Sequence, residues 1–409
     1  MGPVTKPLSF LATLGFLFTA PAAANAWGGP VAAAAPPPVP QVAPLDWARR
    51  VCDAVMKRSP VLTDQWHYDV GLVLSGFESV WRRTGDRRYL DYVKSNVDRL
   101  VGDGGVIKKG YEPEKYILDD VNMGKVLFAL MAESRDAAEK ERYRKVLYAL
   151  RAQLVTQPRT ADGGFWHKQI YPHQMWADGI YMASPFLAQF AAVFGEPAAL
   201  DDAVKQVLVA EKHLRDPKTG LLYHGWDESK KERWANPRTG LSSQFWGRGV
   251  GWYAMGVADV LAEMPKDHPK RAAVVAVLRR LATAIARVQD PATGVWWQVL
   301  DAAGRPGNYL EASASAMFVY ALTKGVGNGW LDAKRFAPVA ARGYAGTVSL
   351  FVAADATGDV HVNKICKVAG LGGDPYRDGT YAYYIGTEVV PDDPKGVGAF
   401  ILASAARGP

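Results

Sequence analysis

The stretch Asp290-Pro-Ala-Thr-Gly294, followed by the aromatic run Val295-Trp-Trp-Gln-Val299, decides the fold, because turns of this kind recur along the chain. The other turns are Asp103-Gly-Gly105, Ala161-Asp-Gly-Gly164, Asp216-Pro-Lys-Thr-Gly220 and Asp355-Ala-Thr-Gly358. A glycine at the end of such a turn supplies the positive φ that reverses the chain. The closing glycines at 164, 220, 294 and 358 lie 56, 74 and 64 residues apart. This spacing predicts a repeat architecture.

Helical periodicity fills the segments between these turns. Apolar residues recur at spacings of three and four, as at Val146, Leu147, Leu150 and Leu154. The pattern predicts twelve helices, near residues 45–58, 66–84, 87–101, 119–133, 138–155, 177–194, 197–214, 243–263, 267–289, 310–325, 331–348 and 395–407. Short alternating or aromatic stretches follow three of the turns, at residues 165–168, 221–224 and 295–299.

Twelve helices give six helical hairpins, which can stack as an open solenoid or close into a double ring. An open stack needs a terminal repeat with a polar outer face, and the sequence contains no clear one. We therefore predict an all-α domain over residues 45–409, an (α/α)6 barrel of six helical hairpins. Short β-like turns should gather at one end of the barrel, where a ligand cavity is expected.

The first 44 residues differ in composition from the rest. Lys6, the apolar run 8–19 and the small residues Ala24-Asn-Ala26 predict a signal peptide over residues 1–26, with an uncleaved anchor as the alternative. Residues 27–44 are rich in proline and alanine and predict an extended tether. No later segment is apolar for the length of a bilayer. We expect an exported protein, periplasmic or extracellular, without a membrane span after cleavage.

Charge and cysteine content exclude several classes of protein. The net charge of +7 is spread along the chain without a run of five like charges, so no nucleic-acid partner is expected. Two cysteines are too few for a disulfide framework or a four-cysteine zinc site. Export permits a disulfide between Cys52 and Cys366, and two buried free thiols are an equal alternative. No pattern indicates an oligomeric state.

Aromatic residues and histidines gather in the middle third of the chain. Eight of the thirteen tryptophans lie at positions 166, 176, 226, 234, 246, 252, 296 and 297. As a set they predict a carbohydrate cleft, because sugars stack their C–H faces on aromatic planes, whereas each alone could pack in the core. Histidines 67, 167, 173 and 224 lie near aromatic residues and are candidate ligand contacts. The spacing of the histidines does not suit a metal site, and no metal or other cofactor is expected.

Three acidic residues at predicted helix starts are candidates for catalysis. Asp178 could cap its helix. Alternatively, the apolar residues around Asp178 could desolvate it and raise its pKa to that of a proton donor. Asp119 and Asp120 open another helix, and either could be a cap or the second carboxylate that glycoside hydrolysis often needs.

The segment Phe245-Trp-Gly-Arg-Gly-Val-Gly-Trp252 combines aromatic residues, a cation and three glycines. Glycines at a helix start are costly unless another group approaches the backbone closely, either a ligand or a tightly packed helix. Arg248 lies among aromatic residues, where a bidentate clamp for a carboxylate would fit.

These segments together resemble glycoside hydrolase family 105, the unsaturated rhamnogalacturonyl hydrolases. The resemblance runs from about residue 45 to the end of the chain. Its most specific parts are Phe165-Trp-His-Lys-Gln-Ile-Tyr-Pro-His-Gln-Met-Trp-Ala-Asp-Gly179 and the region 223–252. Shorter matching stretches are residues 66–69, 118–125, 363–373 and 393–396.

The resemblance implies an (α/α)6 barrel that removes an unsaturated uronic acid from the non-reducing end of pectin-derived oligosaccharides, such as rhamnogalacturonan fragments. Water adds across the C4=C5 bond, with Asp178 as general acid/base and Asp119 as the second acid. The predicted substrate-binding residues are His67, Tyr68, His167, Lys168, His173, Trp176, His224, Arg248 and Trp252. An inverting glycosidase acting on saturated oligosaccharides and a non-catalytic sugar-binding protein are the alternatives.

Overall fold

The computed structural model describes residues 1–2 and 42–407. Residues 3–41, which contain most of the predicted signal peptide and tether, lie outside the described residues, as do residues 408–409.

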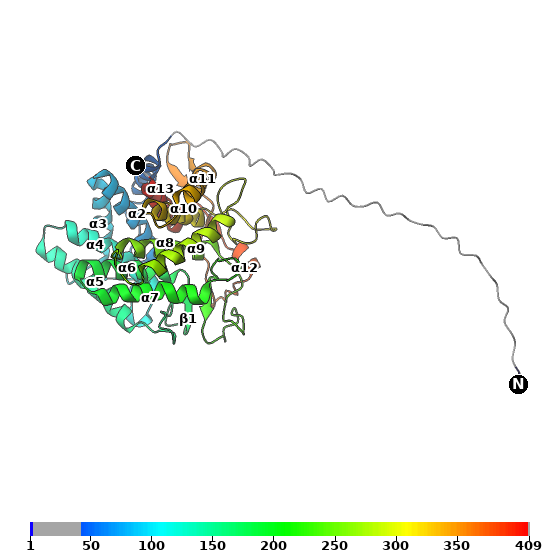
Figure 1. Ribbon diagram of the computed structural model, residues 1–409. Coiled ribbons are helices and arrows are strands. Elements are labelled where there is room, and N and C mark those ends of the chain that lie inside the picture. The colour runs from blue at the N-terminus through cyan, green and yellow to red at the C-terminus, as the bar shows by residue number, and fades with distance from the viewer. Residues whose placement is uncertain (3–41, 408–409) are drawn as a thin grey trace. The chain divides into compact units, whose positions relative to one another are not determined.

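Twelve helices of nine residues or more make up most of this region, and they match the twelve predicted ones (Figure 1). They are α1 (Pro44–Arg58), α2 (Tyr68–Thr84), α3 (Arg87–Leu100), α4 (Lys125–Glu133), α5 (Ala137–Thr156), α6 (Gly179–Phe194), α7 (Pro197–Leu214), α8 (Gly247–Glu263), α9 (Arg271–Arg287), α10 (Ala312–Gly327), α11 (Ala333–Phe351) and α13 (Pro394–Arg407). Three shorter helical segments are η1 (Pro113–Lys115), η2 (Leu118–Gly124) and α12 (Tyr381–Ile385).

The start of α4 differs from its prediction. Residues 118–124 form the 3-10 helix η2, and the α-helix begins only at Lys125. The indole Nε1 of Trp66 donates a hydrogen bond to the carbonyl oxygen of Asp120, at 2.6 Å. This hydrogen bond ties the 3-10 segment to the residues that precede α2.

The helices form two concentric rings. In the inner ring α2 packs against η2 and α4, which are followed in order by α6, α8, α10 and α13, and α13 packs back against α2. Figure 1 shows α2 and α13, from opposite ends of the described chain, beside each other. Helices α1, α3, α5, α7, α9 and α11 each pack against an inner helix. The ring is therefore closed, which confirms the (α/α)6 barrel and excludes the open solenoid.

The pattern of apolar residues explains which helices lie inside. Helix α6 carries apolar residues on nearly all faces and is buried along most of its length, as expected for a helix between two layers. Helix α5 buries one stripe, including Tyr143, Leu147 and Leu154, and exposes charged residues elsewhere. Amphipathic helices of this kind form the outer ring.

The recurring turns lead from an outer helix to the next inner one, so they gather at the amino-terminal ends of the inner helices. Their positive φ angles fall on Gly105, Gly163, Gly220, Gly294 and Gly358. In the second turn the residue is therefore Gly163 and not the closing glycine.

The β structure at this end is short. Strands β1 (Gln174–Trp176) and β2 (Gly225–Asp227) form an antiparallel pair. Two further antiparallel pairs are β3 (Val352–Ala354) with β4 (Val360–Val362), and β5 (Ile365–Cys366) with β6 (Val389–Val390). The predicted stretches at 165–168, 221–224 and 295–299 contribute isolated bridges, such as Arg215 with Leu222.

Two other expectations are decided by these residues. Cys52 and Cys366 are both buried free thiols, so the disulfide alternative is excluded. None of the helices within residues 42–407 combines the length and apolar character needed to cross a membrane.

Candidate active site

A cavity of about 430 Å³ opens at the amino-terminal ends of the inner helices. We call it the mouth cavity. Nine of the eleven predicted site residues line it, and these are His67, Tyr68, Asp119, His167, Lys168, Trp176, Asp178, Arg248 and Trp252. They come from four inner-ring segments and from the turns between them, so the barrel brings together residues from position 67 to position 252.

The other two predicted residues lie elsewhere. His224 is fully buried directly behind Asp178 and does not line the cavity. His173 lies on the turn before β1, where its side chain is 48% exposed and its Nδ1 is 3.7 Å from a carboxylate oxygen of Glu228. His173 therefore lies outside the mouth cavity. Proximity to aromatic residues in the sequence did not reveal that the side chain points to solvent.

Only some of the clustered tryptophans belong to the cavity. Trp176, Trp246 and Trp252 line it. Trp296 is fully buried against Phe318, and Trp226 stacks on His213 with ring centroids 3.7 Å apart. Three of the eight tryptophans therefore lie where the carbohydrate-cleft interpretation requires them, and core packing accounts for Trp226 and Trp296.

Asp178 occupies the N-cap position of α6 but does not cap the helix, since its side chain makes no capping hydrogen bond. Its Oδ2 lies 3.3 Å from Nε2 of the buried His224. Its Oδ1 is buried and has no hydrogen-bond partner among the described residues. This arrangement leaves one carboxylate oxygen of Asp178 uncommitted while the other is held in place.

The charge state of Asp178 differs from our expectation. Burial alone would raise its pKa, but the neighbouring His224 outweighs burial and holds the pKa of Asp178 below its usual range. The sequence indicated the apolar surroundings of Asp178. It did not indicate that the chain places a histidine 46 residues later against the same carboxylate.

The structure separates the two adjacent acids at the start of η2. Asp119 lines the cavity, with Oδ2 at 2.7 Å from Nζ of Lys168 and Oδ1 at 3.4 Å from Nε2 of His167. Burial would raise the pKa of Asp119, but the Lys168 ammonium holds it below the usual range. Asp120 does not line the cavity, and burial together with the charge of Asp119 raises its pKa to about 7. Asp119 is therefore the acid that faces the site.

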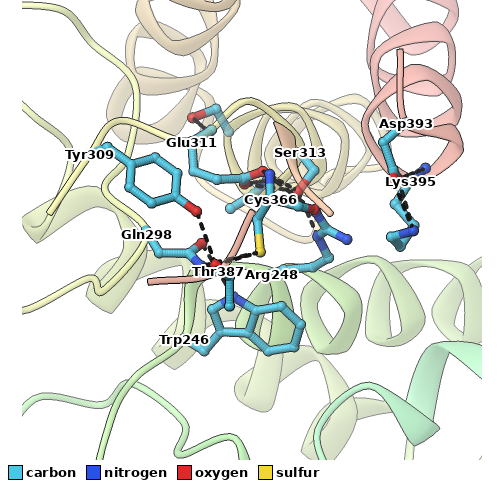
Figure 2. A network of polar contacts seen from close by, with 12 residues as sticks. Trp246, Arg248, Gln298, Tyr309, Glu311, Ser313, Cys366, Thr387, Asp393 and Lys395 are labelled. Atoms are coloured by element: carbon cyan, nitrogen blue, oxygen red, sulfur yellow. Dashed lines mark hydrogen bonds and ion pairs between the residues drawn. The ribbon is translucent and has the colours of Figure 1, made fainter. Parts of the chain in front are cut away.

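Arg248 is 1% exposed and is held on one side only. Figure 2 shows Glu311, Ser313 and Cys366 converging on its guanidinium group. Nε donates to Oγ of Ser313 at 2.7 Å, and Nη2 donates to the carbonyl oxygen of Cys366. The buried carboxylate of Glu311 lies 3.6 Å from Nη2. The remaining nitrogen, Nη1, is buried without a partner among the described residues, which leaves a charged donor available to an anionic ligand.

The three glycines at the start of α8 serve packing. A Cβ atom at Gly251 would lie 2.9 Å from Met317 of α10, and one at Gly247 would lie 3.0 Å from Ala314. A Cβ at Gly249 would come within 3.3 Å of Trp246. The helix-packing alternative therefore holds for Gly247 and Gly251, which face α10, whereas Gly249 faces the rings of Trp246 and His224.

Several cavity residues come from the last third of the chain and were not among the predicted site residues. They are Lys367, Val368, Ala369, Arg377, Asp393 and Lys395, together with Asp69 and Met182 from earlier segments. Nζ of Lys395 lies 2.8 Å from Asp393 and 3.7 Å from Asp69, and Figure 2 shows the first of these pairs at the start of α13. The family-like stretches 363–373 and 393–396 were the available signal, but the sequence did not assign a role to them.

The described residues contain no group of three or more histidine, cysteine, aspartate or glutamate side chains that could hold a metal ion. What converges on the mouth cavity is a set of four carboxylates, several cations and three indole rings. An (α/α)6 barrel with this combination defines a carbohydrate-active protein.

Comparison with known proteins assigns the family. The model of Glycosyl Hydrolase Family 88 matches residues 47–407, and the chain belongs to this family. A solved structure of a family 105 glycoside hydrolase from C. acetobutylicum is 45% identical, with a TM-score of 0.85 over 88% of this chain and 99% of that one. The resemblance to family 105 is thus confirmed.

Two curated relatives add to this comparison. Protein Atu3128 of Agrobacterium fabrum is 40% identical over 229 residues, which cover 55% of this chain and 97% of the relative. The unsaturated rhamnogalacturonyl hydrolase YesR of Bacillus subtilis is 29% identical over 283 residues, which cover 66% of this chain and 74% of that protein.

Proposed function

We propose that this protein is an unsaturated uronyl hydrolase, which removes a 4,5-unsaturated uronic acid from the non-reducing end of rhamnogalacturonan-derived oligosaccharides. The main support for this proposal is a pair of buried atoms that have no hydrogen-bond partner among the described residues, Oδ1 of Asp178 and Nη1 of Arg248. Both residues line the mouth cavity. A proton donor and a fixed cationic donor are what an unsaturated uronate requires. The name of the 29% identical relative YesR supports rhamnogalacturonan fragments as the substrate class.

In this proposal the uronate carboxylate accepts a hydrogen bond from Nη1 of Arg248, and the sugar ring stacks on the indole rings. Asp178 donates a proton from Oδ1 to C4, and the cation that develops at C5 is stabilised by the ionised Asp119. Water adds to C5 and gives its proton back to Asp178. The resulting hemiketal opens and releases the neighbouring sugar, so that one water is consumed and the acid is regenerated.

The low pKa of Asp178 in the free site fits this cycle once substrate is bound. A bound uronate brings a negative charge near Asp178 and expels water from the cavity. Both effects favour the protonated carboxyl, so the pKa of Asp178 rises in the complex. In this proposal Asp178 is ionised in the free site, and the rise of its pKa on substrate binding makes it a proton donor.

The test is an assay on matched pairs of oligosaccharides. We expect the protein to remove the ultraviolet absorbance of lyase-generated unsaturated disaccharides and to leave their saturated counterparts intact. Rhamnogalacturonan-derived substrates should have the highest kcat/KM in the panel. Hydrolysis of saturated oligosaccharides would instead identify an inverting glycosidase, and tight binding without turnover would identify a sugar-binding protein.

We also propose that the protein is exported, on the basis of the signal-peptide pattern in residues 1–26. Expression of the full chain in a Gram-negative host, followed by fractionation and amino-terminal sequencing, tests this proposal. A mature protein that begins at Trp27 outside the cytoplasm is the expected result. Intact residues 1–26 on protein from the cytoplasmic fraction would contradict it.

A further inference from the structure

The fully buried Tyr384, on the short helix α12, contacts the Asp178–His224 pair from behind (Figure 1 shows α12). Its hydroxyl oxygen lies 2.6 Å from Nδ1 of His224, and the opposite ring nitrogen of His224 lies 3.3 Å from Oδ2 of Asp178. Three side chains from residues 178, 224 and 384 thus form a continuous line that ends at the carboxylate in the mouth cavity. This line was not apparent from the sequence.

From this line we infer that Tyr384 is a positioning residue, which fixes the hydrogen of His224 on Nε2 and thereby keeps the catalytic proton of Asp178 on the oxygen that faces the substrate. The inference rests on the proposed function for its kinetic consequences, whereas the tautomer of His224 can be measured without any substrate.

The hydroxyl of Tyr384 sets the direction of the hydrogen bonds along this line. Burial raises the pKa of Tyr384 far above its usual range, so its hydroxyl keeps its hydrogen. Nδ1 of His224 is the one hydrogen-bond partner of this hydroxyl among the described residues. The hydroxyl therefore donates to Nδ1, which leaves the ring hydrogen of a neutral His224 on Nε2. Nε2 then donates to Oδ2 of Asp178.

A donating Nε2 on His224 also restricts which oxygen of a protonated Asp178 carries the proton. If Nε2 were a bare acceptor, a protonated carboxyl could turn its O–H inward and donate from Oδ2 to the histidine. With Nε2 as a donor, that orientation brings two hydrogens together and is unfavourable. The proton of Asp178 is therefore confined to Oδ1, which has no partner within the described residues and belongs to a cavity-lining side chain. Tyr384 thus acts on the proton through His224 without contacting the substrate.

Among the described residues, no other side chain competes for the hydrogen bonds of His224 in the line Tyr384–His224–Asp178. His224 is enclosed by the rings of Trp246 and Trp176, at centroid distances of 4.6 and 5.4 Å. The ionisable groups that act on Asp178 are His224, His167 and Asp119, and those that act on Tyr384 are Tyr383, Asp178, Cys366 and Arg377. Among the described residues, the side chain of His224 has hydrogen-bonded contacts with Tyr384 and Asp178.

The decisive variant is Tyr384→Phe, which removes one oxygen and keeps the ring. Without the donor, the inward orientation of the Asp178 proton becomes available, and this adds a stable protonated state. We expect kcat to fall about 3- to 10-fold, the scale of one neutral hydrogen bond, with KM nearly unchanged. We also expect the limb of the pH–rate profile that reports Asp178 to move to higher pH, because the protonated form has gained stability.

The matched control is Tyr381→Phe on the same helix. The hydroxyl of Tyr381 is exposed and donates to the backbone carbonyl oxygens of Arg305 and Pro306. Its removal should leave kcat, KM and the pH profile unchanged. A Tyr384→Phe protein whose pH profile superimposes on that of the wild type would overturn the inference. So would a loss confined to KM and Tm, because that pattern reports loosened packing.

A spectroscopic test separates this inference from the proposed function. In protein labelled with ¹⁵N-histidine, the ring nitrogen shifts report which nitrogen carries the hydrogen, and the His224 signals are those absent from a His224→Gln protein. We expect the Nε2–H form in the wild type at neutral pH, and under the same conditions a larger share of the Nδ1–H form in Tyr384→Phe. A wild type in the Nδ1–H form refutes the role of Tyr384 even if turnover is found. An Nε2–H form without any turnover refutes only the proposed function.

Discussion

Buried charged side chains line two separate cavities of the barrel, and the two cavities differ in how many partners these side chains have. At the mouth cavity, each buried acid or arginine is held by a partner: Asp119 by Lys168, Asp178 by His224 and Arg248 by Glu311. A second cavity of about 260 Å³ lies among the second halves of α2, α8 and α10, and we call it the far cavity. Its lining includes Lys125, which is buried and whose Nζ has no hydrogen-bond partner among the described residues.

Both cavities therefore contain a buried polar atom without a hydrogen-bond partner among the described residues. Only in the mouth cavity do hydrogen bonds hold the other atoms of the same charged group in place. Two nitrogens of Arg248 are tied to Ser313 and Cys366, so the third nitrogen is held in one direction. Nζ of Lys125 instead lies over the ring of Tyr181 at 3.4 Å, and burial lowers the pKa of Lys125 to about 7. The comparison teaches that a buried unpaired atom indicates a site only when its neighbours preorganise it.

The largest expected effect is at Asp178. Replacing Asp178 by asparagine keeps the shape of the side chain and removes the proton donor, so kcat should fall by about 10² to 10⁴. The matched control is Asp120→Asn, which removes a buried acid that does not line the mouth cavity. Steady-state kinetics on an unsaturated disaccharide measure both variants. If Asp178→Asn keeps its activity within a few-fold of the wild type, Asp178 is no more important for catalysis than Asp120, and its role as proton donor is contradicted.

A smaller loss is expected at Arg248. Lysine keeps the positive charge but carries its donors on a single nitrogen, which cannot replace the three separate nitrogens that Arg248 directs at Ser313, Cys366 and a uronate. Arg248→Lys should therefore lose one charge-assisted hydrogen bond. Such bonds contribute about 1.5–3 kcal/mol, which corresponds to a fall in kcat/KM of about 10- to 100-fold, mainly through KM.

Arg279→Lys is the control for Arg248→Lys, because Arg279 also donates to a backbone carbonyl, that of Trp330, far from the cavity lining. Kinetics and thermal unfolding should be measured together on both variants. Unchanged KM in Arg248→Lys would show that the uncommitted nitrogen does not bind substrate, and that the mouth cavity resembles the far cavity in this respect.

These contrasts also show what the sequence could predict. The twelve helices followed from the spacing of apolar residues, which is a local property, and closure of the ring followed from the missing polar cap. Asp178 and Arg248 could be singled out because each lies in an unusual stretch. Their roles depend on contacts across the ring: His224 lies against Asp178, and Glu311 lies against Arg248. Such contacts are not encoded at a fixed spacing.

The errors have the same origin. His173 and the buried Trp296 are of residue types that often bind sugars, and both lie near aromatic residues in the sequence. The direction of each side chain, however, is set by the turn that carries it. The positive φ of 64° at His173 places it on a sharp turn. The pKa of Asp178 was misjudged because its apolar neighbours are close in the sequence, whereas the histidine that lowers it is not.

The last prediction concerns the far cavity, where no effect on catalysis is expected. Lys125→Met should leave kcat and KM unchanged and should stabilise the fold, because a buried ammonium without a hydrogen-bond partner among the described residues is replaced by an apolar chain of similar length. The gain should be about 1–3 kcal/mol at pH 6, on the scale seen when buried ionic groups are replaced by apolar ones.

The pH dependence of this gain follows from the pKa of Lys125, which is about 7 in the folded protein against 10.5 ordinarily. Between these values the unfolded chain binds a proton that the folded chain has lost, so wild-type stability rises with pH across this window. The advantage of Lys125→Met should therefore be full below pH 7 and shrink toward pH 10, as urea unfolding at several pH values would show. Lys324→Met in the same cavity should destabilise the protein, because it leaves Asp259 without the ammonium 2.7 Å away. A pH-independent gain in Lys125→Met would mean that Lys125 is charged and paired, and the contrast between the two cavities would then fail.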